Sequence, residues 1–198
     1  MKNFVIASNN QGKIKEFNQI FAKLGIKIIS QSELNVPEVD EPFTTFVENS
    51  LHKARHCAKH TGLPALADDS GLCVTSLNGA PGIYSARYAG EPKSDQANID
   101  KLLATLANEQ QRSAYFYCSL VFVRNENDPQ PLIAEGIFNG EIAMQQSGNN
   151  GHGYDPIFYV PEYNATVAEL NEELKNKISH RGIAINQLLT KLKTANLL

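Results

Sequence analysis

The feature that most constrains this chain is residues 63–72, where a short apolar run ends in two carboxylates, a hydroxyl and a glycine. Residues 65–67 favour a buried strand, which places Asp68 and Asp69 at or just beyond its carboxyl end. Neighbouring side chains of a strand point to opposite faces, so at most one acid should aim squarely into a given pocket. Ligand crevices of α/β sheets lie outside the carboxyl ends of strands, and acids there suit Mg²⁺. The alternative is a simple turn, because Asp, Ser and Gly are all turn formers.

Length and composition limit the class of protein. A chain of 198 residues, 42% of them apolar and 20% charged, is typical of one soluble globular domain, with or without an added lobe. The net charge of -3 argues against a sequence-independent grip on nucleic acid, which needs a basic face. Three cysteines without a CxxC pair favour reduced thiols and a cytoplasmic location. No apolar run approaches the roughly 20 residues of a membrane span, so we expect no membrane partner.

The amino-terminal segment predicts a strand, a polar loop and a helix. Residues 4–7 are β-like, residues 8–13 form a loop that contains a glycine, and apolar residues then recur at helical spacing until Gly25. This arrangement presents backbone N–H groups to an anion. Ser8 and Asn10 could add side-chain contacts, and Lys13 would meet a phosphate. The loop lacks the Walker A spacing.

The next segment carries acids and histidines. Residues 26–30 predict a second strand, and residues 37–42 form an acidic loop, of which one acid could complete a metal site with Asp69. Thr45 and Glu48 have capping-box spacing and open a helix that runs to about His60. Three histidines share one face of this helix, which indicates either a zinc site or a polar face: His52, His56 and His60.

The remaining chain predicts further strands and two polar segments. Residues 72–77, 114–123 and 132–138 are β-like, Asn139-Gly140 predicts a turn, and Ser94 and Ser179 are candidate helix caps. The glycine-rich residues 147–158 carry flat side chains and an acceptor, which suit stacking on a base and reading of its edge. The alternative is a surface loop. The basic residues around 175–181 suit phosphate, although such a helix start is often a solvated face.

Several separated segments of the chain match one pattern in order. They are Ser8-Asn-Asn-Gln-Gly-Lys13, Thr45-Phe-Val-Glu-Asn-Ser50 with Lys53-Ala-Arg-His56, Ala67-Asp-Asp-Ser-Gly-Leu72 running into residues 79–88, Gly153-Tyr-Asp-Pro-Ile-Phe158, and Lys175 with Ile178-Ser-His-Arg-Gly182. With these motifs, the sequence closely resembles the inosine triphosphate pyrophosphatase family, the Ham1/RdgB-type XTP/dITP diphosphatases.

The resemblance implies one nucleoside triphosphate pyrophosphatase domain over residues 1–198. Its α/β fold would have a long mixed sheet, flanking helices and two lobes around a central nucleotide-binding cleft. It also implies a homodimer that uses Mg²⁺ to hydrolyse ITP, dITP and XTP to the monophosphate and pyrophosphate. Asp69 is then the catalytic carboxylate, as proton acceptor or metal ligand, and Glu41 is the second metal-binding acid. Glu41 is followed by Pro42-Phe43, where the family usually has a small residue and glycine. The substrate-binding positions are Ser8, Asn9, Asn10, Gln11, Gly12, Lys13, Ser70, His152, Gly153, Tyr154, Asp155, Lys175, His180 and Arg181.

His152 is the clearest departure from the family pattern, which usually has a phenylalanine that stacks on the purine. An imidazole also stacks, with less apolar area, so we expect a retained site with weaker or pH-sensitive base binding. Two alternatives stay open on the residues alone. One is a pyrophosphatase with another base preference, for modified pyrimidine or canonical triphosphates. The other is a nucleotide- or RNA-binding module without catalysis, which would not need Asp69.

Overall fold

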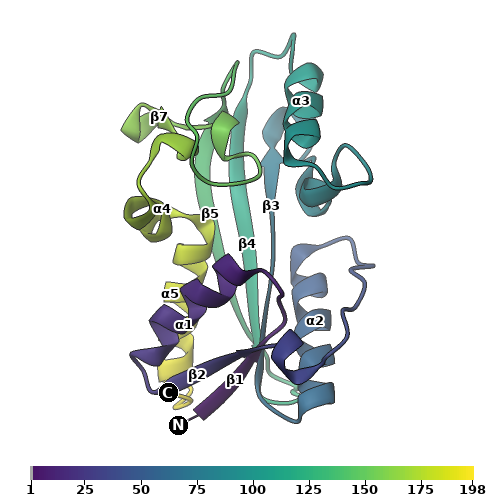
Figure 1. The fold of residues 1–198 in the computed structure, drawn as a ribbon, viewed down its shortest axis with the longest axis vertical. Helices are drawn as coiled ribbons and strands as arrows, with labels where there is room; N and C mark the ends of the chain where they lie inside the picture. Colours follow the sequence, from purple (N-terminus) through teal and green to yellow (C-terminus); the bar gives the residue numbers. More distant parts are fainter. Residues whose placement is uncertain (1) are drawn as a thin grey trace. The chain divides into compact units, whose positions relative to one another are not determined.

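The computed structural model describes residues 2–198 and has an α/β fold built on one seven-stranded sheet (Figure 1). The strand order is β2-β1-β3-β4-β5-β6-β7. β1 pairs in parallel with β2 and β3, whereas β6 pairs antiparallel with β5 and β7, so the sheet is mixed. The strands are β1 (Lys2–Ile6), β2 (Ile26–Ser30), β3 (Ala65–Val74), β4 (Ser113–Val123), β5 (Leu132–Ile142), β6 (Phe158–Val160) and β7 (Ala165–Thr166). The predicted α/β class with a mixed sheet is confirmed.

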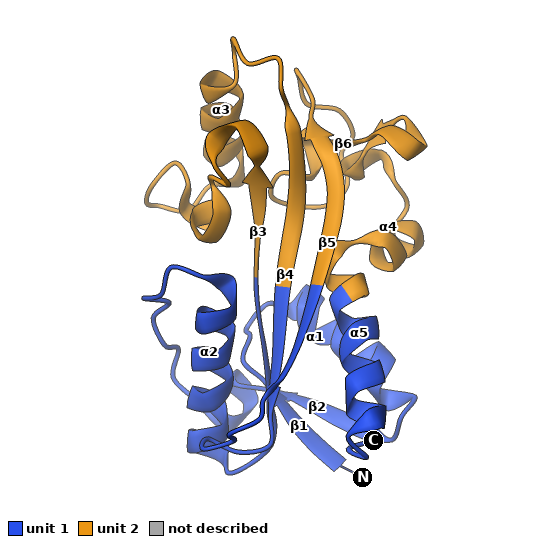
Figure 2. Cartoon of the chain, turned by 180° about the vertical axis from the view of Figure 1, so that it is seen from behind, with its two compact units in different colours: residues 1–69, 119–135, 184–198 blue, residues 70–118, 136–183 orange. Residues whose placement is uncertain are grey.

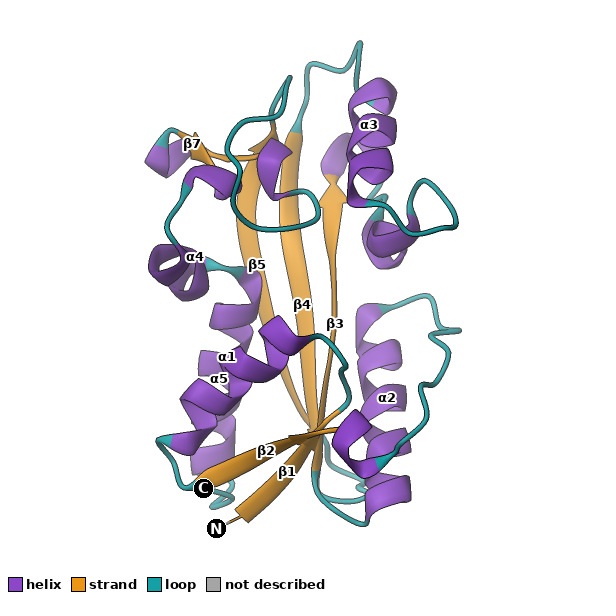
Figure 3. Ribbon diagram, viewed as in Figure 1, coloured by secondary structure: helices purple, strands orange, loops and turns teal. Residues whose placement is uncertain are grey.

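Five α-helices accompany the strands within the described residues (Figure 3). They are α1 (Gln11–Ala22), α2 (Phe46–Thr61), α3 (Asp95–Thr105), α4 (Glu172–Ile178) and α5 (His180–Thr194). The predicted caps are confirmed: the side chains of Thr45, Ser94 and Ser179 accept from the backbone N–H groups of Glu48, Ala97 and Gly182 at the starts of α2, α3 and α5. Over residues 2–198, no helix combines the length and the apolar character that crossing a membrane requires.

The chain divides into two compact units (Figure 2). Unit 1 comprises residues 1–69, 119–135 and 184–198, and unit 2 comprises residues 70–118 and 136–183. β3, β4, β5 and α5 each contribute residues to both units. The two units agree with the two predicted lobes, while the cleft between the lobes and the single-domain description stay predictions.

Unit 1 has a core on each face of its strands. Val5, Ala65 and Ala67 pack with Ala54 and Cys57 of α2. The alternate residue Phe4 meets Phe21 of α1, with ring centroids 6.2 Å apart, so α1 covers the opposite face. Acids on consecutive positions of β3 therefore have different helices as neighbours.

Unit 2 packs α3 on its strands. Ile99, Leu102 and Leu106 form one buried cluster with strand residues such as Leu72 and Phe158. Arg112 is buried beside this core, and its guanidinium donates to four backbone carbonyls, including those of Leu106 and Ile142. This core fixes the strand ends from which the loop of residues 147–155 departs.

Two predicted strand boundaries are wrong. The strand predicted over residues 65–67 does not end at Asp68, because β3 continues to Val74 and includes the first half of the second strand predicted over residues 72–77. Asp, Ser and Gly are weak strand formers, but β3 lies between β1 and β4, and pairing within the sheet outweighs local preference. Asn139-Gly140 likewise lies inside β5 instead of forming a turn. A side chain at Gly140 would collide with the backbone and ring of the neighbouring β6, so the glycine serves close approach of two strands.

Candidate active site

The first group of predicted residues lies where β1 gives way to α1. β1 ends at Ile6, and residues 8–10 lead into the first turn of α1, which holds Gln11, Gly12 and Lys13. Asn10 is the helix cap, with its Oδ1 accepting from the backbone N–H of Lys13 at 3.1 Å. Ser8 Oγ accepts from the backbone N–H of Asn10 at 3.2 Å. Strand, loop and helix start are thus arranged as predicted for presenting N–H groups to an anion.

Asp68 and Asp69 lie beside this loop, although they do not end their own strand. The last paired residues of β1 and β3 are Ile6 and Leu66, so the two acids follow two and three positions beyond the end of β1. Asp68 contacts Lys13 of α1, and Asp69 contacts Asn49 of α2. The predicted alternation of the two side chains is therefore confirmed, and the acids sit at the carboxyl end of a neighbouring strand.

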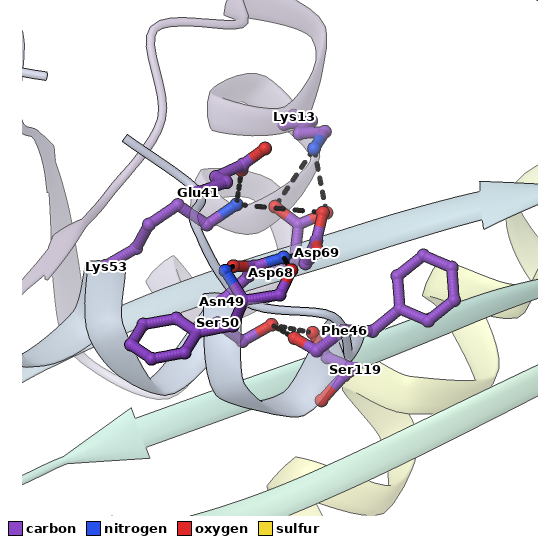
Figure 4. Close-up of polar contacts among 10 residues, drawn as sticks. Lys13, Glu41, Phe46, Asn49, Ser50, Lys53, Asp68, Asp69 and Ser119 are labelled. Carbon is purple, nitrogen blue, oxygen red and sulfur yellow. Dashed lines mark hydrogen bonds and ion pairs between the residues drawn. The ribbon is translucent and has the colours of Figure 1, made fainter. Parts of the chain in front are cut away.

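Lys13 and Asp68 form a close ion pair (Figure 4). The Lys13 Nζ atom lies 3.0 Å from Oδ1 and 2.8 Å from Oδ2 of Asp68. The Asp68 side chain is 1% exposed and that of Lys13 is 22% exposed. The lysine predicted to hold phosphate is thus already fixed over the loop by a buried acid.

The second predicted pair, Glu41 and Asp69, meets at one lysine. Lys53 Nζ of α2 lies 2.5 Å from Glu41 Oε1 and 3.9 Å from Asp69 Oδ1 (Figure 4). Lys53 and Asn49 are not among the site residues predicted from the sequence, although both lie in a matched motif. Their spacing of four residues places them on one helix face, and polar groups on the inward face of a helix were the available signal.

Burial and charge set the ionisation of this cluster. Burial raises the pKa of Asp69 to about 6, and Glu41 and Asp68 add to the rise, while Lys53 and the Asn49 hydrogen bond oppose it. For Lys53, burial favours the neutral amine, but the carboxylates of Asp69, Asp68 and Glu41 outweigh burial and raise its pKa above the ordinary value. Asp69 is thus a carboxyl that exchanges protons near neutral pH.

The donor set around Glu41 and Asp69 fits a hard cation. Mg²⁺ is usually held by one or two carboxylates together with substrate phosphates. Among Lys13, Glu41, Lys53, Asp68 and Asp69, three carboxylates face two ammonium groups. One more positive charge would balance this cluster and relieve the cost of ionising Asp69.

Of the two interpretations left open for the histidine face of α2, a zinc site and a polar face, the contacts favour the polar face. His56 Nε2 lies 2.8 Å from the Pro37 carbonyl oxygen, and His60 Nδ1 lies 2.9 Å from the carbonyl oxygen of His56. Within residues 2–198, no group of three or more His, Cys, Asp or Glu side chains is placed to hold a metal ion. This histidine face instead contacts the loop of residues 37–43, through His56 at the Pro37 carbonyl and His52 at the Phe43 ring.

Unit 2 contains a second predicted group, centred on Asp155. Its carboxylate accepts from Lys175 Nζ at 2.5 Å and from the backbone N–H of His152 at 2.8 Å, and it lies 3.5 Å from His152 Nδ1. Burial alone would raise the pKa of Asp155, but the His152 and Lys175 contacts outweigh it and hold the pKa below its ordinary value. Gly151 has φ +83°, and a side chain there would collide with the Asp155 carboxylate. The Asp155 carboxylate therefore brings His152 and Lys175, two other predicted nucleotide contacts, to one place.

The other predicted residues of unit 2 have different surroundings. Tyr154 is buried in the core, and its hydroxyl donates to the Ser85 carbonyl at 2.9 Å. Gly153 donates its backbone N–H to Asp95 at 2.7 Å. Ser70 lies in β3, and His180 and Arg181 open α5. The His180 ring stacks on Phe116 with centroids 4.9 Å apart. The nucleotide contacts of these residues stay predictions.

The chain belongs to the Ham1 family, whose model matches residues 4–191. A protein of Neisseria meningitidis named dITP/XTP pyrophosphatase is 56% identical over 189 residues, which cover 95% of each chain. A protein of the same name from Chromobacterium violaceum is 54% identical over 189 residues, which cover 96% of each chain. The solved HAM1 protein of Coxiella burnetii is 52% identical, with a TM-score of 0.95 over 98% of this chain and 100% of that one.

Proposed function

We propose that this chain is a Mg²⁺-dependent pyrophosphohydrolase that converts ITP, dITP and XTP to the monophosphate and pyrophosphate. It would thereby remove non-canonical purine nucleotides from the nucleotide pool. The names of its relatives support the substrate class. The observation that carries the proposal is the meeting of Glu41 and Asp69 at Lys53, beside the phosphate-type loop that precedes α1.

Under this proposal, the start of α1 and lysine side chains bind the triphosphate. Backbone N–H groups at a helix start and a positive dipole end attract phosphate oxygens. Lys13 exchanges part of its contact with Asp68 for a phosphate oxygen, and Asp68 keeps the ammonium over the loop. The lysine is therefore oriented before the substrate arrives, which lowers the entropic cost of binding.

Glu41 and Asp69 are the proposed holders of Mg²⁺. When bound, Mg²⁺ neutralises phosphate charge and polarises the phosphorus under attack. Lys53, which contacts both acids, keeps them oriented and supplies positive charge of its own. Asp69 is also the candidate to accept a proton from the attacking water, and its buried position near Lys53 orients the carboxylate for this role.

The reaction is an attack of water on the α-phosphorus. A new P–O bond forms from the water oxygen, the bond between the α-phosphorus and the bridging oxygen breaks, and that oxygen leaves with pyrophosphate. The water loses its proton to a carboxylate, for which Asp69 is the candidate. Catalysis rests on positioning and charge neutralisation, because no covalent intermediate is required.

Base selection is proposed for the residues of unit 2. A 6-oxo purine offers an acceptor where adenine has an amino group. Donors from the backbone or from His180 and Arg181 would be mispaired with that amino group, and sites built on such hydrogen bonds reject analogues strongly. His152, whose side chain is 64% exposed, is available to stack on the base.

The test is pyrophosphate release from ITP, XTP, GTP, ATP and dUTP with Mg²⁺, compared between the natural chain and Asp69→Asn. Asp100→Asn, an exposed acid of α3, is the matched control. Fast release from ITP and XTP, slow release from GTP and ATP, and a loss confined to Asp69→Asn are expected. ITP binding without release from any substrate would overturn the proposal in favour of a binding module.

A second candidate is a pyrophosphatase of different base preference. It is favoured by His152, the imidazole at the stacking position, which lies 3.5 Å from the Asp155 carboxylate. Equal release from canonical triphosphates or dUTP in the same assay would support it.

A homodimer and a cytoplasmic location belong to the same proposal. The three cysteines are buried thiols that form no disulfide, which suits a reducing compartment. Sedimentation equilibrium of the purified chain tests the dimer, and a single species at the 21.8 kDa monomer mass would contradict it.

A further inference from the structure

The acidic loop of residues 37–43 is held along one face of α2. Lys53 contacts Glu41, His56 contacts the Pro37 carbonyl, and the His52 ring lies edge-on to Phe43 with centroids 5.4 Å apart. Asn49 lies on the same helix face and contacts the Phe43 backbone. Positions 49, 52, 53 and 56 follow helical spacing, so the loop that carries Glu41 lies on the α2 face from end to end.

Asn49 is the residue of this helix face that contacts both the loop, at Phe43, and β3, at Asp69. Its Oδ1 accepts from the Phe43 N–H at 3.1 Å, and its Nδ2 donates to the Phe43 carbonyl at 3.3 Å. The same Nδ2 donates to Asp69 Oδ2 at 3.2 Å (Figure 4). The side chain is buried, with 1% exposure.

The three contacts require a carboxamide. A side-chain amide offers two N–H donors on one atom and an acceptor on the other, and all three functions are used here. A carboxylate at position 49 could not donate to Asp69, and an aliphatic side chain would leave the Phe43 backbone and one Asp69 contact unmade. Only one orientation of the amide satisfies all three partners, which fixes its assignment.

We propose that Asn49 is a positioning residue that sets Asp69 relative to the loop bearing Glu41. The inference rests on the proposed function, in which these two acids hold the cation. Glu41 is two residues from Phe43 in the chain, so a hydrogen-bonded amide between Phe43 and Asp69 fixes the separation of the two carboxylates. Partners that orient metal ligands in this way are worth about 10–100-fold in metal affinity.

The test measures Mn²⁺ binding by electron paramagnetic resonance of the free ion, with and without inorganic pyrophosphate. Asn49→Leu keeps the number and branching of the side-chain heavy atoms and removes all three hydrogen bonds, and Asn49→Ser carries the test if the leucine variant does not fold. Both variants are expected to bind Mn²⁺ about 10–100-fold more weakly. They should also need correspondingly more Mg²⁺ for half-maximal pyrophosphate release, with partial recovery at saturating Mg²⁺.

Asn98 of α3 provides a matched control. It is equally buried, and its amide accepts from the Ala89 N–H at 2.7 Å and donates to the Ala86 carbonyl at 3.3 Å. Asn98→Leu should therefore lose stability as Asn49→Leu does, while its Mn²⁺ affinity is unchanged. A merely structural role of Asn49 would make the two variants alike.

The outcomes separate this inference from the function on which it rests. If the natural chain binds Mn²⁺ and releases pyrophosphate, and folded Asn49 variants bind Mn²⁺ within threefold of it, the positioning role is refuted and the function stands. If the natural chain neither binds Mn²⁺ nor releases pyrophosphate, the proposed function fails, and the inference fails with it.

Discussion

The ammonium of Lys13 lies within 3.0 Å of both carboxylate oxygens of Asp68, and it joins the first turn of α1 to the middle of β3. A contact between elements 55 positions apart in the chain contributes to stability as well as to the orientation of the lysine. It can therefore be measured without any substrate.

The coupling between Lys13 and Asp68 is the first prediction. In a double-mutant cycle of Lys13→Met and Asp68→Asn, followed by urea unfolding, we expect a coupling energy of about 0.5–3 kcal/mol. Lys13→Met should cost more than the double variant, because it leaves a buried carboxylate without its ammonium. Strictly additive effects of the two changes would contradict the contact.

The ionisation of Asp69 predicts an unusual pH dependence of stability. Its pKa is raised by burial from 3.8 to about 6, so its protonated form is favoured by folding. The stabilisation is complete below the unfolded pKa and is lost as pH rises through about 6. In the metal-free chain, Asp69→Asn should therefore gain stability relative to the natural chain with rising pH, by about 1–3 kcal/mol at pH 7.5. Unfolding in urea with EDTA at pH 4.5, 6 and 7.5 tests this, and a constant difference across pH would refute it.

The ionisation of Asp128 predicts the opposite pH dependence of stability. Its buried carboxylate accepts from the backbone N–H groups of Arg124 and Gln130, both at 2.9 Å, and from the Arg124 guanidinium. The Arg124 hydrogen bond is the main cause that holds the pKa of Asp128 well below its usual range. Its contribution is therefore present above the unfolded pKa and is lost as pH falls.

Asp128→Asn should destabilise the chain by about 1–3 kcal/mol at pH 7, because an amide accepts fewer hydrogen bonds than the carboxylate and is uncharged. The difference should shrink below about pH 4. Glu126→Gln in the same turn is the control. Equal thermal unfolding of Asp128→Asn and the natural chain at pH 7 would show that the turn does not depend on the carboxylate.

The side chain at position 152 is expected to affect base binding in the proposed site. His152 is 64% exposed and lies 3.5 Å from the Asp155 carboxylate, and the imidazole in place of a phenylalanine leads us to expect weaker or pH-sensitive binding of the base. His152→Phe has more apolar area for stacking, so it should lower the KM for ITP and flatten its dependence on pH between 5.5 and 8. Indistinguishable profiles of the two chains would sink this expectation.

Local sequence patterns were sufficient for much of this chain. Thr45 and Ser94 act as the predicted caps because capping involves residues within one helical turn. The opposite directions of Asp68 and Asp69 follow from the two-residue period of a strand. The loop from Ser8 to Lys13 was recognisable because strand, loop and helix start are consecutive in the chain.

Only the tertiary structure decided what these residues meet. The carboxyl end that matters to Asp68 and Asp69 is that of β1, a neighbour some sixty positions earlier, and the pairing of β3 with that neighbour cannot be read from local propensity. Asn49 and Lys53 acquired their roles because the loop bearing Glu41 folds back on α2. Periodic patterns specify which face a side chain occupies, whereas long-range pairing determines which carboxylate, amide or ammonium lies opposite that face.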